Sequence, residues 1–176
     1  MKKLLLIGFS AALFLGACGT EEAAEKPAAE DKQTAAGTEG TADTKQELIR
    51  FYMSISKTIN AADADLNTFE VNQTEGTLPE GADLQAMTDA AKTSAEKTSE
   101  AVAGIEIPAA LEEQTADIEK AFEAIQESYD MKAAELAKEA SFEAANEKFL
   151  EADETLNVLL EEHELAASSL FNEVSQ

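Results

Sequence analysis

The sequence predicts an all-α protein, a four-helix up-down-up-down bundle behind a cleaved signal peptide and a disordered spacer. Three observations lead to this prediction. From residue 44 onward, apolar residues recur three and four positions apart, which is the period of a helix face. Glycine and proline interrupt the pattern, and no stretch alternates as a strand would. The content of Ala, Glu, Lys and Leu favours helix throughout.

The first two helices are expected over residues 44–72 and 82–103. The apolar positions of the first are Leu48, Tyr52, Ile55, Ile59, Ala62, Leu66 and Phe69, and those of the second are Leu84, Met87, Ala91, Ala95, Thr98 and Val102. Thr44 and Glu47 form a capping box at the start of the first helix. Two glycines and a proline in the segment 72–81 should end that helix. Gly104 should end the second helix as a C-cap.

The third and fourth helices are expected over residues 108–138 and 141–174. The third carries Leu111, Ile118, Phe122, Ile125, Tyr129 and Leu136, and the fourth carries Phe142, Ala145, Phe149, Ala152, Leu156, Leu159, His163, Ala166 and Leu170. The second set starts out of phase with the first, which favours a turn near residues 139–141 with Ser141 as N-cap. The alternative is one helix over residues 109–174, roughly 100 Å long. Such a helix would not close a compact domain.

The N-terminal segment has the layout of an export signal. Lys2 and Lys3 precede an apolar run, residues 4–15, which is shorter than the roughly 20 residues of a membrane span. The run ends in Leu15-Gly16-Ala17-Cys18, which resembles the lipobox of bacterial lipoproteins at all four positions. The resemblance implies removal of residues 1–17 and a diacylglyceryl group on Cys18, and it leaves acylation of the new amino terminus open. Two acyl chains hold a protein stably, so we expect a lipid-anchored protein on the extracytoplasmic face of the cell membrane.

Residues 18–43 are expected to form the lipidated cysteine and a disordered acidic spacer. Residues 19–43 contain no Val, Ile, Leu, Met or aromatic residue, so they have almost no apolar surface to bury. A flexible coil of about 25 residues spans roughly 25–30 Å. This layout resembles the surface lipoproteins of Gram-positive bacteria. The helical domain is then expected over residues 44–176.

The charge of the chain limits its partners. The formal net charge is −23, and it becomes −25 once Lys2 and Lys3 leave with the signal peptide. Nucleic acids and anionic head groups attract clustered Lys and Arg, so we expect no nucleic-acid binding. Contact with the membrane is expected through the lipid on Cys18 alone, and an envelope protein is the expected partner. No disulfide can form within the chain, because Cys18 is its single cysteine.

Two motifs that imitate reactive sites do not meet the requirements of those sites. Asp63-Ala-Asp65-Leu-Asn67 resembles the opening of a calcium loop, but glycine is replaced by Thr68 and the closing glutamate by Thr74. His163 is the single histidine, which excludes paired metal-binding histidines within the chain. We expect it to be a half-buried residue near a helix end, where His163-Glu164 marks a candidate bend before a last short turn that starts at Ser168 and Ser169. The sequence therefore predicts no enzyme activity, no metal and no cofactor.

Apolar residues outside the helix seams form a possible interaction face: Ile49, Phe51, Met53, Leu150, Val158, Leu160 and Phe171. In a four-helix bundle the terminal helices are neighbours, so the same residues could serve to pack the first helix against the fourth. The remaining possibility is a face that binds a helix or an apolar ligand. We expect a non-catalytic binding or adaptor module in the cell envelope. The alternative is a lipoprotein that binds a metal ion or a small apolar molecule.

Overall fold

The computed structural model describes residues 36–136 and 140–175, with side chains from residue 43 onward. In this part of the chain all regular structure is helical and there is no strand, which confirms the all-α prediction. The elements are α1 (Ala36–Ala62), α2 (Ala64–Glu75), α3 (Ala82–Ala103), the 3₁₀ helix η1 (Ala109–Gln114), α4 (Thr115–Glu135), α5 (Glu143–Glu162) and α6 (Leu170–Val174). The predicted signal peptide and Cys18 lie outside the described residues.

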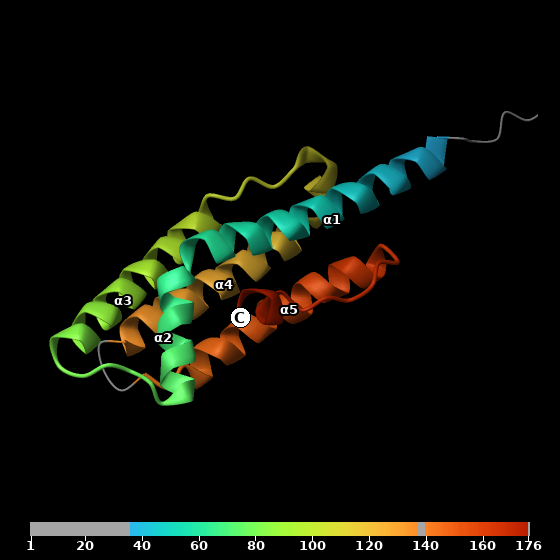
Figure 1. Ribbon diagram of the computed structural model, residues 1–176. Helices are drawn as coiled ribbons and strands as arrows, with labels where there is room; N and C mark the ends of the chain where they lie inside the picture. Colours follow the sequence, from blue (N-terminus) through green and yellow to red (C-terminus); the bar gives the residue numbers. More distant parts are fainter. Residues whose placement is uncertain (1–35, 137–139, 176) are drawn as a thin grey trace, which may run out of the picture. The chain divides into compact units, whose positions relative to one another are not determined.

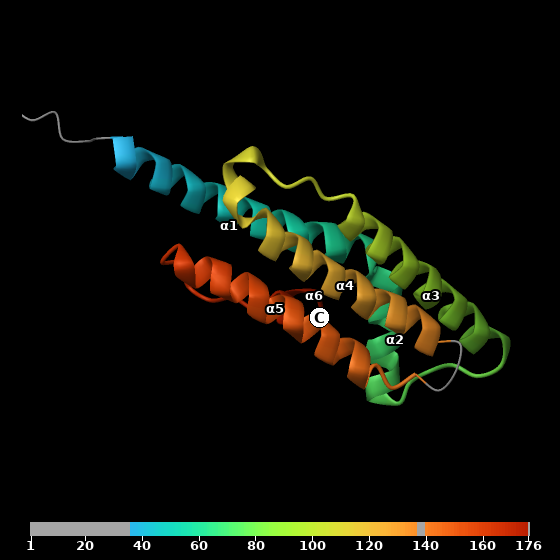
Figure 2. The ribbon, with the colours of Figure 1, turned by 180° about the vertical axis from the view of Figure 1, so that it is seen from behind.

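The long helices pack in a row that is closed by the end of the chain. α5 packs against α4, α4 against α3, and α3 against both α1 and α2. The short helix α6 contacts both α1 and α5, so it fills the space between the first and the last long helix. Figures 1 and 2 show this arrangement from opposite sides, with the chain end beside α5.

The core consists largely of the predicted seam residues. The first predicted seam is buried at Leu48, Tyr52, Ile55, Ile59, Leu66 and Phe69, and the later seams at Ile118, Phe122, Ile125, Tyr129, Phe149, Leu156 and Leu159. Aromatic rings link the helices. The ring centroid of Phe51 in α1 lies 6.0 Å from that of Phe122 in α4, and the ring centroid of Tyr129 in α4 lies 6.1 Å from that of Phe149 in α5. α3 contributes mainly small residues, including Ala91 and Ala95, and these allow its neighbours to approach closely.

The first predicted helix, 44–72, is two helices. α1 ends at Ala62 and α2 begins at Ala64, and α2 turns sharply away from the axis of α1 (Figure 1). Asp63 between them has a non-helical ψ of 8°. The free carbonyl of Ala62 accepts a hydrogen bond of 2.7 Å from the Ser94 hydroxyl of α3, which stabilises the break from outside.

The start of this region differs from the prediction, whereas its end lies within the predicted segment 72–81. α1 begins at Ala36, so the helix includes residues 36–43 that were assigned to the spacer, and Thr44 lies inside the helix and is not its cap. Adding a turn to an existing helix costs far less than starting one, and this offsets the low helix propensity of Gly37 and Gly40. The stop is as expected: Gly76 ends α2 with a left-handed φ of 68°, and the amide of Thr77 donates to Asn72.

In the third predicted helix, 108–138, the regular α-helix begins later than predicted, after a 3₁₀ helix. The residues after Pro108 form η1, and Leu111 departs from helical geometry with φ −110° and ψ 22°. The regular helix α4 then runs over Thr115–Glu135. The side chain of Leu111 is fully buried, so packing of this residue fixes the tighter turn.

α4 and α5 are separate helices, and the second begins two residues after the expected start at 141. Phe142 precedes α5 with a left-handed φ of 56°, which replaces Ser141 as the cap. Its amide donates a 2.6 Å hydrogen bond to the carboxylate of Glu135, and its ring packs edge-on against Phe69 of α2. Burial of the Phe142 ring thus compensates for an unfavourable backbone conformation.

The fourth predicted helix, 141–174, is also two helices, because the chain reverses after α5. Glu164 has a positive φ of 54°, and the chain returns along α5 to form α6. The carboxylate of Asp153 accepts hydrogen bonds from the Ser169 hydroxyl (2.9 Å) and the Leu170 amide (2.7 Å). This confirms the expected bend and the short last turn. The prediction of a single helix over 141–174 did not include this reversal, which brings α6 into the core.

Candidate functional site

The possible interaction face does not exist as one surface. Phe51 and Leu160 are each only 4% exposed and belong to the core, so including them in an interaction face was wrong and the alternative, a packing role, holds for these two. Their burial follows from the contacts that α1 and α5 each make with α6 as well as with a long helix, which require a wider apolar face. Phe171 is half-buried, and its ring lies 5.6 Å from Phe149. The other four, Ile49, Met53, Leu150 and Val158, are exposed.

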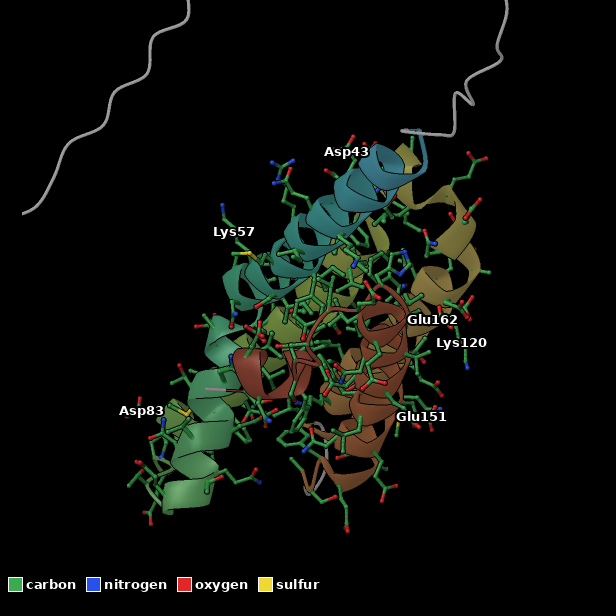
Figure 3. The ribbon with its side chains drawn as sticks, turned by 90° about the vertical axis from the view of Figure 1, so that its right-hand side faces the viewer. Asp43, Lys57, Asp83, Lys120, Glu151 and Glu162 are labelled. Atoms are coloured by element: carbon green, nitrogen blue, oxygen red, sulfur yellow. The ribbon has the colours of Figure 1, made fainter. Side chains whose placement is uncertain are left out.

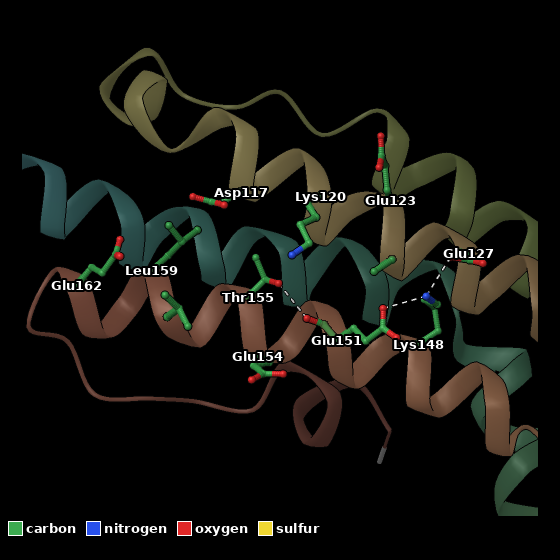
Figure 4. Close-up of a pocket in the computed structure, with 12 residues that line it drawn as sticks. Asp117, Lys120, Glu123, Glu127, Lys148, Glu151, Glu154, Thr155, Leu159 and Glu162 are labelled. Carbon is green, nitrogen blue, oxygen red and sulfur yellow. Dashed lines mark hydrogen bonds and ion pairs between the residues drawn. The ribbon is translucent and has the colours of Figure 1, made fainter.

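An acidic groove lies between α4 and α5 (Figure 4). Its volume is about 700 Å³. Six carboxylates and two lysines line it, together with four less polar residues: Asp117, Lys120, Glu123, Ala124, Glu127, Lys148, Glu151, Glu154, Thr155, Val158, Leu159 and Glu162. Figure 3 shows Lys120 of α4 on the same side of the molecule as Glu151 and Glu162 of α5. The groove therefore combines an excess of negative charge with a small apolar strip.

One lysine in the acidic groove is already paired. The ammonium of Lys148 lies 2.8 Å from Glu151 and 3.5 Å from Glu127, and so it links α5 to α4. The hydrogen bond to Glu151 raises the pKa of Lys148 above its ordinary value. Asp117 and Glu162 line the other end of the groove, where a cation can approach them from solvent. An open groove of this kind attracts and orients a positively charged ligand.

A buried polar cluster lies where α1 meets α2. We use this name for Asp63, Glu70, Tyr129 and Lys132. The Tyr129 hydroxyl donates a 2.8 Å hydrogen bond to one carboxylate oxygen of Asp63. The Lys132 ammonium lies 2.8 Å from Glu70 and within 6 Å of the Tyr129 and Phe142 ring centres. The cluster thereby ties α2 to α4 in the interior of the domain.

Asp63 is the unusual member of the buried polar cluster. Its side chain has no solvent exposure, and its second carboxylate oxygen, Oδ1, has no hydrogen-bond partner. Burial raises the pKa of Asp63 to about 6, while the Tyr129 hydrogen bond and the Lys132 charge act in the opposite direction. Since Lys132 already pairs with Glu70, ionised Asp63 leaves one negative charge in the cluster without compensation.

The prediction for His163 agrees with the geometry, and the calcium-like segment lies at the junction of α1 and α2. His163 is half-buried at the end of α5, and its Nδ1 lies 3.1 Å from the Leu159 carbonyl oxygen. Asp63 and Asn67 belong to a helix junction: the first binds Tyr129, and the second donates a hydrogen bond to the Val174 carbonyl. Among the described residues, no group of three or more His, Cys, Asp or Glu side chains has the arrangement of a metal site.

The sequence did not identify the acidic groove or the buried polar cluster. Acids are so frequent along this chain that spacing alone does not show which ones meet across two helices. Asp63 could have been singled out, because it is a charged residue directly after the seam residue Ala62, within a strongly periodic apolar segment. Its partner Tyr129 is 66 residues away, so the pairing depends on the tertiary structure.

Comparison of the chain with protein-family models, with curated proteins and with solved structures finds no match. Among the helices in the described part of the chain, none combines the length and the apolar character needed to cross a membrane.

Proposed function

We propose that this protein is a lipid-anchored lipoprotein of the extracytoplasmic membrane face, whose helical domain is a non-catalytic binding or adaptor module of the cell envelope. In this proposal α1, α3, α4 and α5 act as an up-down-up-down bundle. The acidic groove receives a cationic segment of an envelope protein. The signal peptide, the lipid on Cys18 and the spacer supply the location.

The observation that carries the binding role is the acidic groove itself. It presents six carboxylates from two helices, with the exposed side chain of Val158 among them. A partner segment with several Lys or Arg side chains and an aliphatic residue would match both properties. Complementary charge speeds encounter and selects the partner, and the apolar strip adds contact area once water is displaced.

The location is supported by Leu15-Gly16-Ala17-Cys18 and by the composition of the segment after it. A spacer of roughly 25 Å exceeds the screening length of about 8 Å at physiological salt. The acidic domain therefore experiences little repulsion from an anionic membrane surface.

Replacing Cys18 with serine tests the location. Serine has no thiol to accept the diacylglyceryl group, so we expect the protein to accumulate unprocessed or to appear in the medium. Fractionation of cells followed by mass determination of the N-terminus measures this. A serine variant that remains membrane-bound and is trimmed before residue 18 would overturn the lipid anchor.

Site-specific photocrosslinking on intact cells tests the binding role. A photoreactive residue at Val158, inside the acidic groove, should capture a discrete protein neighbour. The same residue at Met53, which is 65% exposed on α1, is the matched control and should not. We expect the Val158 adduct to weaken at high salt and in Glu154→Lys, because screening or reversing charge removes the attraction.

Two outcomes would contradict the role of the acidic groove. Adducts from Met53 alone would indicate that the partner contacts α1 and not the groove. If neither position gave a protein adduct, the adaptor role would be contradicted. A rise in Tm of the full chain on addition of calcium, zinc or an apolar probe would favour the alternative, a ligand-binding lipoprotein.

A further inference from the structure

We infer that the α1–α2 junction is a proton-operated joint, in which Asp63 binds a proton to close α2 against α4 and releases it to loosen that contact. This inference concerns the domain alone and is independent of the proposed partner and anchor.

The first observation is that the junction is a break held together by side chains. Regular hydrogen bonding continues on both sides, from the Asp63 amide to the Ile59 carbonyl and from the Asn67 amide to the Asp63 carbonyl. Between them, the Ala62 carbonyl is bound by Ser94 of α3. The angle between α1 and α2 therefore depends on contacts with α3 and α4, and a change in those contacts can change the angle.

The second observation is the charge balance around Asp63. The titratable and charged groups that face it are Glu70 of α2 and Tyr129 and Lys132 of α4. From α3 comes the neutral hydroxyl of Ser94, which binds the carbonyl of Ala62, the residue before Asp63. Lys132 pairs with Glu70 at 2.8 Å, so the cluster is neutral when Asp63 carries a proton. Loss of the proton leaves a buried net charge of −1.

The third observation is the unpartnered Oδ1 of Asp63, which no described side chain or amide satisfies. An ionised carboxylate accepts several hydrogen bonds and loses stability when an oxygen is buried without one. Opening the junction would admit water to that oxygen. Ionisation therefore favours the open state, and protonation favours the closed state.

The sign of the pH dependence follows from linkage. Burial raises the pKa of Asp63 from 3.8 in solvent to about 6 in the closed domain. The closed state thus binds the proton more tightly than the open state, and its advantage is lost as the pH rises from about 4 to about 6. A difference of about two pKa units corresponds to roughly a 100-fold change in the opening equilibrium.

Hydrogen exchange of the full chain at pH 5 and pH 7.5, corrected for intrinsic rates, measures the joint directly. In the wild type we expect protection of the α2 amides (64–75) to fall by about ten-fold at the higher pH. Asp63→Asn keeps the shape and can still accept the Tyr129 hydrogen bond, so its protection should not change between the two pH values. Asp65→Asn, a change to an exposed residue of the same type two positions later, should behave as the wild type.

A carboxyl titration by NMR gives a second readout that does not depend on Asp63→Asn folding. The Asp63 midpoint should lie near pH 6 in the wild type. It should move upward in Tyr129→Phe, because the lost hydrogen bond stabilised the charged form. A midpoint near 4, α2 protection independent of pH in the wild type, or a downward move in Tyr129→Phe would each overturn the inference.

Discussion

Replacing Leu170 with alanine is expected to lower the free energy of unfolding by about 2–5 kcal/mol. Leu170 is fully buried, although it belongs to a helix of only five residues at the end of the chain. Such a short helix is not stable alone, so its position depends on this side chain and on Val174. Removal of the isobutyl group leaves a cavity between α1 and α5 and weakens the contacts that hold α6. Urea unfolding followed by circular dichroism measures the change.

Leu150→Ala on α5 is the matched control, because it deletes the same atoms from a side chain that is 48% exposed. We expect it to cost less than about 1 kcal/mol. Equal effects of the two substitutions would show that α6 does not occupy the core in solution.

Replacing Lys132 with methionine is expected to cost about 3 kcal/mol. The change keeps the approximate volume but leaves the Glu70 carboxylate, which is 21% exposed, without its cation. It also removes the positive charge that stabilises ionised Asp63, so the pH dependence of stability should move to higher pH. Thermal and chemical unfolding between pH 5 and pH 8 measures both effects.

Two further variants distinguish this charge effect from a loss of packing. Adding Glu70→Gln to Lys132→Met removes the uncompensated charge and should restore most of the lost stability. Lys148→Met breaks an ion pair of the same 2.8 Å length at the surface, where solvent screens the charges and we expect a much smaller loss of stability. If Lys132→Met and Lys148→Met cost the same, the buried position of the first pair has no energetic consequence.

The helical class and most core positions could be predicted because they follow from local periodicity. Ile55, Ile59 and Leu66 recur at helical spacing and are all fully buried. The same periodicity concealed the break at Asp63, because Leu66 and Phe69 stay in register on its far side. What bends the chain there is a hydroxyl from α3 and a phenol from α4, which no local pattern contains.

The surface was harder to predict than the core. Val158 and Leu150 were correctly taken as apolar residues beyond the seam, and both are exposed. Phe51 and Leu160 came from the same reasoning and are buried, since the width of an apolar face depends on how many neighbours a helix has. The number of neighbours followed from the reversal at Glu164, which was expected only as a bend.

Both tyrosines of the chain are buried, Tyr52 under the returning C-terminal segment and Tyr129 in the buried polar cluster. Burial raises the pKa of Tyr52 to about 12 and that of Tyr129 well above its ordinary value. The chain has no tryptophan, so these two phenols dominate its near-ultraviolet spectrum. Their phenolate absorbance should therefore appear in alkali only when the interior becomes accessible, which gives the native protein a spectroscopic reporter that needs no label.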